Sequence, residues 1–135
     1  MEADVERIRR ELIEDGRYPL DAYDFVRQGL GLAVRMFHGD DPDEPRHVTG
    51  QQLCEALRRL ALQRWGLLAP MVLRSWHIYS THDFGEIVFK LVELGMLGKQ
   101  ESDRIEDFDD VYRIEAIADG YRIPVDPKDA DEADE

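Results

Sequence analysis

Residues 76–89, "WHIYSTHDFGEIVF", contain a helix start and the densest group of candidate functional side chains in the chain. Ser80 with Asp83, or Asp83 with Glu86, supplies oxygen acceptors for the free amide groups of a first helical turn. Apolar side chains then follow at helical spacing, until Gly95 ends the pattern: Phe84, Ile87, Val88 and Leu91. The stretch therefore predicts a turn and then a helix that begins near Ser80 and ends near Gly95.

The same stretch also suggests metal chemistry. Asp83-Phe84-Gly85 matches the magnesium-binding triplet of protein kinases, but the sequence lacks the glycine-rich phosphate loop and the catalytic loop of those enzymes. His82 and Glu86, spaced i and i+4, would share one helix face, and His77 or Asp83 could complete a ligand set. We favour a capped helix, no cofactor and no catalytic residue. A metal-dependent enzyme or enzyme subunit built on these four residues stays open as an alternative.

Other helices are predicted on both sides of this stretch. One follows an apolar stripe through Ile8 and Leu12 to Gly16, and the next runs from Pro19 to His38. A third opens on a Thr49/Gln52 capping box and ends at Gly66, and a short fourth, "LAPMVLRSW", has a proline in its first turn. The first of these stripes also includes Val5 and Ile13.

Beyond Gly95, "MLGKQ" and "DFDDVY" suggest two extended pieces joined as a hairpin, and "RIEAIADGY" suggests a short last helix with Ile114 and Ile117 inward. We therefore expect a mainly α, single compact domain of about five or six helices over residues 1–123. Its helix-turn-helix pair followed by a small β-hairpin is similar to a winged helix. Residues 124–135 contain two prolines and almost no large apolar side chain, which predicts a disordered acidic tail.

Composition limits the possible functions. The chain has 135 residues, enough for one domain, and 30 acidic against 17 basic residues leave a net charge of −13. A charge of that sign repels nucleic acid and anionic lipid. The single cysteine, Cys54, has no partner for an internal disulfide, and the apolar run "GLLAPMVL" is far shorter than the roughly 20 residues of a membrane span. We expect a soluble, cytoplasmic protein that does not enter a membrane.

No motif in the sequence supports catalysis. The hydroxyl and thiol side chains lack a glycine-flanked nucleophile motif, and Cys54 lies on an apolar helical stripe. Four arginines on the third and fourth predicted helices form a candidate basic patch for nucleic acid, as in a winged helix: Arg58, Arg59, Arg64 and Arg74. The predicted recognition helix, however, carries an acidic exposed stripe, which disfavours a DNA groove.

The remaining functional class is a non-catalytic module that binds another protein. Aromatic side chains at helix ends or on second helix faces are typical contact anchors, and the candidates here are Trp65, Trp76, Tyr79 and Phe89. Packing in the core is the alternative for each of them. We expect an interaction or adaptor protein, and neither the partner nor the oligomeric state follows from the sequence.

Three blocks of the chain resemble a known family: "YPLDAYDFV", "TGQQLCEALRRLALQRWG" and "VLRSWHIYSTHDFGEIVFKLVELGMLGKQESDRIEDFDDVY". In order, over roughly residues 17–118, they look like an uncharacterised family of short proteins found mainly in planctomycete and verrucomicrobial bacteria. The resemblance implies no activity, ligand or partner. This chain has His77 and Ile114 where the family more usually has glycine and phenylalanine, which lowers the functional weight of His77.

Overall fold

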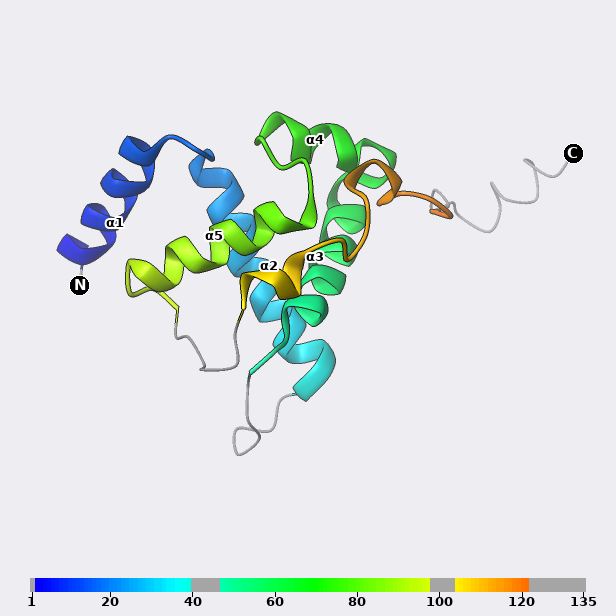
Figure 1. The fold of residues 1–135 in the computed structure, drawn as a ribbon, viewed down its shortest axis with the longest axis horizontal. Coiled ribbons are helices and arrows are strands. Elements are labelled where there is room, and N and C mark those ends of the chain that lie inside the picture. The colour runs from blue at the N-terminus through cyan, green and yellow to red at the C-terminus, as the bar shows by residue number, and fades with distance from the viewer. Residues whose placement is uncertain (1, 40–46, 98–103, 122–135) are drawn as a thin grey trace, which may run out of the picture.

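The computed structural model describes residues 2–39, 47–97 and 104–121 and has an all-α fold over these ranges (Figure 1). Its α-helices are α1 (Glu2–Asp15), α2 (Leu20–His38), α3 (Gly50–Trp65), α4 (Ala69–Ser75) and α5 (Thr81–Glu93). Three short 3-10 helices complete it: η1 (Gly66–Leu68), η2 (Ile105–Phe108) and η3 (Ile114–Ala116). The described part of the chain contains no strand and no helix long and apolar enough to cross a membrane.

Local sequence signals set the helix ends, as predicted. Thr49 and Gln52 form both bonds of a capping box, at 3.0 Å from the Gln52 amide to Thr49 Oγ1 and at 2.9 Å from the Thr49 amide to Gln52 Oε1. Pro19 precedes the first residue of α2, and Gly16, at φ +70°, follows the end of α1. The helix predicted near residues 80–95 is confirmed as α5.

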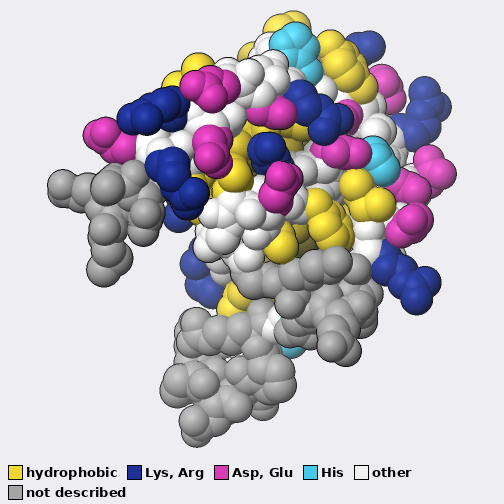
Figure 2. All heavy atoms as spheres, turned by 60° about the vertical axis from the view of Figure 1, so that its left-hand side comes forward, with side chains coloured by type: hydrophobic (Ala, Val, Ile, Leu, Met, Phe, Trp, Pro, Cys, Tyr) yellow, Lys and Arg dark blue, Asp and Glu magenta, His cyan; other side chains and the backbone are white. Residues whose placement is uncertain are grey.

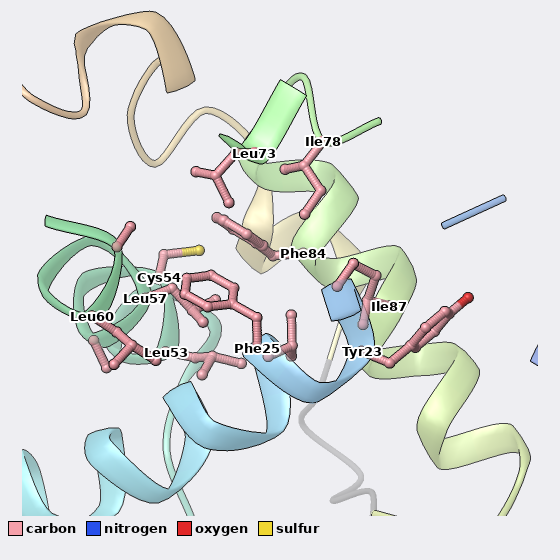
Figure 3. Close-up of a cluster of buried hydrophobic side chains, with 14 of the residues drawn as sticks. Tyr23, Phe25, Leu53, Cys54, Leu57, Leu60, Leu73, Ile78, Phe84 and Ile87 are labelled. Carbon is pink, nitrogen blue, oxygen red and sulfur yellow. The ribbon is translucent and has the colours of Figure 1, made fainter. Parts of the chain in front are cut away.

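Phe25 of α2 lies at the centre of the core, between α3 and α5 (Figure 3). Its ring centroid is 5.2 Å from that of Trp65, 5.7 Å from that of Trp76 and 6.5 Å from that of Phe84. Buried residues of α3, including Leu53, Leu57 and Leu60, close one side of this cluster. The predicted apolar stripe of α5 is confirmed for Phe84, Ile87 and Leu91, which are fully buried, while Val88 is half-buried.

Two features of the helix packing concern α1 and the contact between α2 and α3. In α1, Ile8 and Leu12 are buried, but Val5 and Ile13 of the same predicted stripe are 48% and 63% exposed. Between α2 and α3, a Cβ added to Gly29 would lie 2.2 Å from Leu57 Cδ2, so only glycine permits this close contact. The backbone of α2 at Gly29 therefore packs directly against the Leu57 side chain of α3.

The second strand of the predicted hairpin is wrong, and the described residues contain no strand that would support the winged-helix comparison. "DFDDVY" forms η2 and a turn, with Asp110 at φ +52°, because a side chain of α5 takes its backbone groups. Thr81 Oγ1 donates to the Phe108 carbonyl at 2.5 Å and accepts from the Val111 amide at 3.2 Å. Tyr112 also donates to the Cys54 carbonyl at 2.7 Å, which holds this segment across α3 and α5.

The other C-terminal predictions have mixed outcomes. The last predicted helix is only the single 3-10 turn η3, although Ile114 and Ile117 point inward and are buried as expected. The first predicted strand covers residues 96–100, and its last three residues lie outside the described part of the chain. The predicted tail, residues 124–135, lies outside it entirely.

Candidate functional site

Asp83 is a helix cap, which is the structural interpretation that the sequence favours. One carboxylate oxygen of Asp83 accepts from the Tyr79 amide at 2.8 Å and from the Ser80 amide at 3.1 Å. Its other oxygen accepts from the buried Tyr18 hydroxyl at 2.6 Å. The carboxylate thus ties the start of α5 to the α1–α2 connection.

The other two residues of the Asp-Phe-Gly triplet also have structural roles. Phe84 is fully buried beside Phe25. A Cβ on Gly85 would lie 2.8–3.0 Å from three side-chain atoms of Phe108, so glycine lets η2 pack directly on α5. Each member of the triplet is explained by helix capping or packing.

His82 joins two parts of the fold through ion pairs. Its Nδ1 lies 2.5 Å from Asp109 Oδ1 and its Nε2 lies 3.0 Å from Glu86 Oε1. The second oxygen of Glu86 accepts from Arg17 at 3.2 Å. Hydrogen bonding to Asp109, followed by Glu86, raises the pKa of His82 above its ordinary value of 6.5. The cluster links α5 to the segment after η2 and to the α1–α2 connection.

The four candidate metal ligands are divided between different contacts. His82 and Glu86 contact each other, but Asp83 caps the helix, and His77 lies 3.5 Å from the Tyr79 hydroxyl. Over residues 2–39, 47–97 and 104–121, no group of three or more His, Cys, Asp and Glu side chains is arranged to hold a metal ion. Cys54 is buried, and burial raises its pKa to about 12, so its thiol stays protonated.

The four arginines of the candidate basic patch fall into two groups. Arg58 and Arg59 both lie beside Glu55, at 3.8 and 3.6 Å. Arg64, in the last turn of α3, donates to the Gln28 side chain on α2. Arg74 is exposed in the last turn of α4 and makes no ion pair with a described acid.

The four candidate anchors also differ in their surroundings. Trp65 and Trp76 are half-buried and pack edge to face, with centroids 5.3 Å apart, against the core ring of Phe25. Phe89 is half-buried as well. Tyr79 alone among the four is mainly exposed, at 56%.

A set of exposed apolar side chains was missed in the sequence. Leu67, Leu68 and Met71, which we call the α4 ridge, are 56%, 57% and 66% exposed. They lie within five consecutive residues of η1 and α4, where spacings of three and four place side chains next to each other. The α4 ridge therefore exposes three large apolar side chains within one short segment.

The segment of the chain that contains the α4 ridge differs in charge from the rest of the sequence. Residues 56–82 contain no aspartate or glutamate and carry four arginines, whereas all 30 acidic residues lie elsewhere in the chain. On the side of the molecule where α1 lies in Figure 1, by contrast, acidic and basic side chains alternate around exposed apolar ones (Figure 2). A count of acids along the sequence would have located this segment.

A groove of about 440 Å³ lies on the other side of α2. Six of its eight lining residues come from α2, among them Asp24 and Arg27, and the other two, Met96 and Leu97, follow the end of α5. It is lined by apolar and charged groups and includes no nucleophile or histidine among these residues.

No protein-family model matches this chain, and no curated protein or solved structure is significantly similar to it. The resemblance to the planctomycete and verrucomicrobial family stays a prediction.

Proposed function

We propose that this protein is a non-catalytic module that binds another protein through the α4 ridge. The observation that carries the proposal is the exposure of three adjacent large apolar side chains, Leu67, Leu68 and Met71, on a segment whose other face is buried. Ala69 and Leu73, on the same short helix, are fully buried, so α4 is held firmly against the core. A rigid apolar surface loses little conformational entropy on binding.

The energetic argument concerns these three side chains. Burying a leucine or methionine completely stabilises a complex by about 1.5–3 kcal/mol relative to leaving it in water. Each ridge side chain keeps more than half of that contribution available for a partner. Single exposed apolar residues are ordinary, but adjacent ones mark interaction surfaces. Tyr79, the exposed member of the predicted anchors, follows the ridge in sequence and is a further candidate contact for the partner.

The two alternatives have less support. Nucleic-acid binding through the four arginines is weakened because Arg58 and Arg59 share Glu55, so only Arg64 and Arg74 have no described acid beside them. A metal-dependent enzyme is weakened because Asp83, one of the four candidate ligands, is engaged by two backbone amides and by Tyr18. Neither alternative accounts for the exposed apolar side chains of the α4 ridge.

The proposal is tested by site-specific photo-crosslinking in cells of the source organism. A photoreactive phenylalanine analogue replaces Leu68 in one variant and Ile13 of α1 in the control. Both of these side chains are mainly exposed. We expect a discrete crosslinked protein from position 68 that is lost when Met71→Asp is added. The same adducts from both positions, or none from position 68, would contradict the proposal. Both variants should melt within about 3 °C of the wild type, because the replaced side chains are exposed.

A further inference from the structure

We infer that the partner of the α4 ridge is an acidic amphipathic helix, that is, a segment with one apolar face flanked by aspartate or glutamate. The inference rests on the proposed function and adds the chemistry of the partner. It is carried by the charges at the edge of the ridge, by their contrast with the rest of the chain and by the geometry of the ridge itself.

The edge of the ridge carries two arginines available to a partner. Arg74 follows Met71 by three residues on α4, so the two side chains are neighbours on one helix face. Arg64 precedes Leu67 by three residues, in the last turn of α3, and its contact is with the neutral amide of Gln28. Neither guanidinium pairs with a carboxylate of the described residues, whereas Arg58 and Arg59 share Glu55. Arginines of this kind form bidentate bonds with carboxylates.

The remaining surface directs an acidic segment to this place. All 30 acidic residues lie outside residues 56–82, and the chain as a whole carries a charge of −13. An acidic partner is repelled by most of the molecule, whereas the segment of the ridge carries arginines and no acid. Glu115 of η3, which packs against α4, already lies 3.8 Å from Arg113. A basic partner would be attracted almost everywhere else. Charge complementarity therefore assigns an acidic partner to the ridge and disfavours a basic one.

The form of the ridge favours a helix over an extended peptide. Extended peptides gain affinity by adding a strand to an open sheet edge, and the described part of the chain has no sheet. The ridge side chains repeat at the three- and four-residue spacing that packs into the grooves of another helix. A nucleic acid would satisfy the arginines but would leave the three apolar side chains without apolar contacts.

The test selects binders from a display library of random helical peptides of about 16 residues, long enough to span the ridge. Four forms of the full chain serve as targets. The first is the wild type, and the second is the ridge variant Leu68→Ser/Met71→Ser. The third is the edge variant Arg64→Gln/Arg74→Gln, and the fourth is a matched charge control, Arg7→Gln/Arg10→Gln, on the exposed face of α1. Single-stranded DNA is measured on the same four targets.

We expect the peptides selected by the wild type to combine an apolar stripe with acidic flanks. They should lose binding to the ridge variant, bind the edge variant about tenfold more weakly, and bind the charge control as the wild type does. Binders that need the ridge but are neutral or basic, or that ignore the edge variant, would overturn this inference and leave the proposed function standing. Binders that ignore the ridge variant would overturn both. Tighter binding of DNA than of any peptide, lost in the edge variant, would assign the arginines to nucleic acid instead.

Discussion

His77 occupies a backbone position that normally belongs to glycine. Its φ is +66°, and the amides of His77 and Ile78 donate to the carbonyls of Arg74 and Leu73, both at 3.0 Å. These two bonds form a Schellman motif that ends α4, completed by the buried contact partners Leu73 and Ile78 (Figure 3). A glycine at this position would adopt the same φ without strain.

The substitution His77→Gly should therefore leave the protein as stable as the wild type or raise its free energy of unfolding by up to about 1 kcal/mol. His77→Val should lower it by about 1–2 kcal/mol, because a β-branched side chain tolerates a positive φ poorly. Urea denaturation at neutral pH measures both. Ser75→Gly, inside the last turn of α4, is the control and should be destabilising. Equal losses in His77→Gly and His77→Val would show that the imidazole itself is required.

Asp83→Ala should lower the free energy of unfolding by about 2 kcal/mol, more than a cap alone, because it also leaves the buried Tyr18 hydroxyl without its acceptor. In Tyr18→Phe, that hydroxyl is already gone, so adding Asp83→Ala should cost only about 1 kcal/mol. Chemical denaturation of the four proteins of this cycle measures the coupling. Strict additivity of the two substitutions would show that the Tyr18–Asp83 bond contributes nothing.

His82 should make the stability of the protein depend on pH. Its pKa is raised in the folded state, so its stabilising contribution is complete below the unfolded value of 6.5 and is lost as the pH rises through the folded pKa. His82→Gln should thus lower the melting temperature more at pH 6 than at pH 8.5. The free energy of unfolding should fall by no more than about 1 kcal/mol, since the imidazole is 41% exposed. Asp109→Asn removes the main cause of the shift and should reduce the same difference. An equal loss of melting temperature in His82→Gln at pH 6 and at pH 8.5 would show that the charge of His82 does not stabilise the fold.

At the scale of elements, glycines decide how closely two segments approach. Gly85→Ala should lower the free energy of unfolding by about 1–3 kcal/mol, because the new methyl group would overlap the Phe108 ring and displace η2 from α5. Gly31→Ala, in α2, is the matched control. Its added Cβ would have Arg35 Nη1 at 3.8 Å as its nearest neighbour, so we expect a gain of about 0.5–1 kcal/mol from helix propensity. Thermal unfolding of both variants gives the comparison, and a stabilised Gly85→Ala would show that η2 is not packed as described.

The elements that could be predicted from the sequence are those whose signals are local. The capping box at Thr49 and the cap at Asp83 act within three or four residues, and both were found. The hairpin failed because the backbone of residues 108–111 bonds to Thr81, 27 and 30 residues away in sequence. The aromatic and β-branched residues of "DFDDVY" favour a strand, but a distant side chain determines its hydrogen bonds.

At the scale of the whole molecule, the candidate site was only partly predictable. Tyr79 was a candidate anchor with core packing as its alternative, and its side chain is 56% exposed. The sequence could not distinguish Met71 and Leu68 from core residues, because their helical spacing is also that of a buried face. Which side of α4 is covered depends on how Leu73 and Ile78 meet the cluster around Phe25, a contact between distant segments. The acid-free segment, by contrast, is visible in the sequence.

The distribution of charge over the chain leads to a prediction about its end. Residues 101–135 hold 14 acids and 4 bases, and residues 124–135, outside the described ranges, hold 6 acids and 1 lysine. The last described residue, Tyr121, has its ring against Gly66, since a Cβ added there would lie 3.1 Å from Tyr121 Cε1. Because Tyr121 lies beside η1, we predict that residues 124–135 compete with an acidic ligand for Arg64 and Arg74.

Deleting residues 124–135 should consequently raise the salt concentration at which the protein elutes from heparin, with almost no change in melting temperature. The difference in heparin binding between the full-length and truncated proteins should be largest at low ionic strength. Exposed ion pairs contribute about 0–1 kcal/mol each and are screened within about 8 Å at physiological salt. The control keeps the full chain and removes the same net charge of −5 by converting five exposed carboxylates to amides, at Glu6, Glu14, Asp24, Glu93 and Asp119. If control and truncated protein elute together, net charge alone accounts for the effect. Later elution of the truncated protein means that the acidic end covers the arginines beside the α4 ridge.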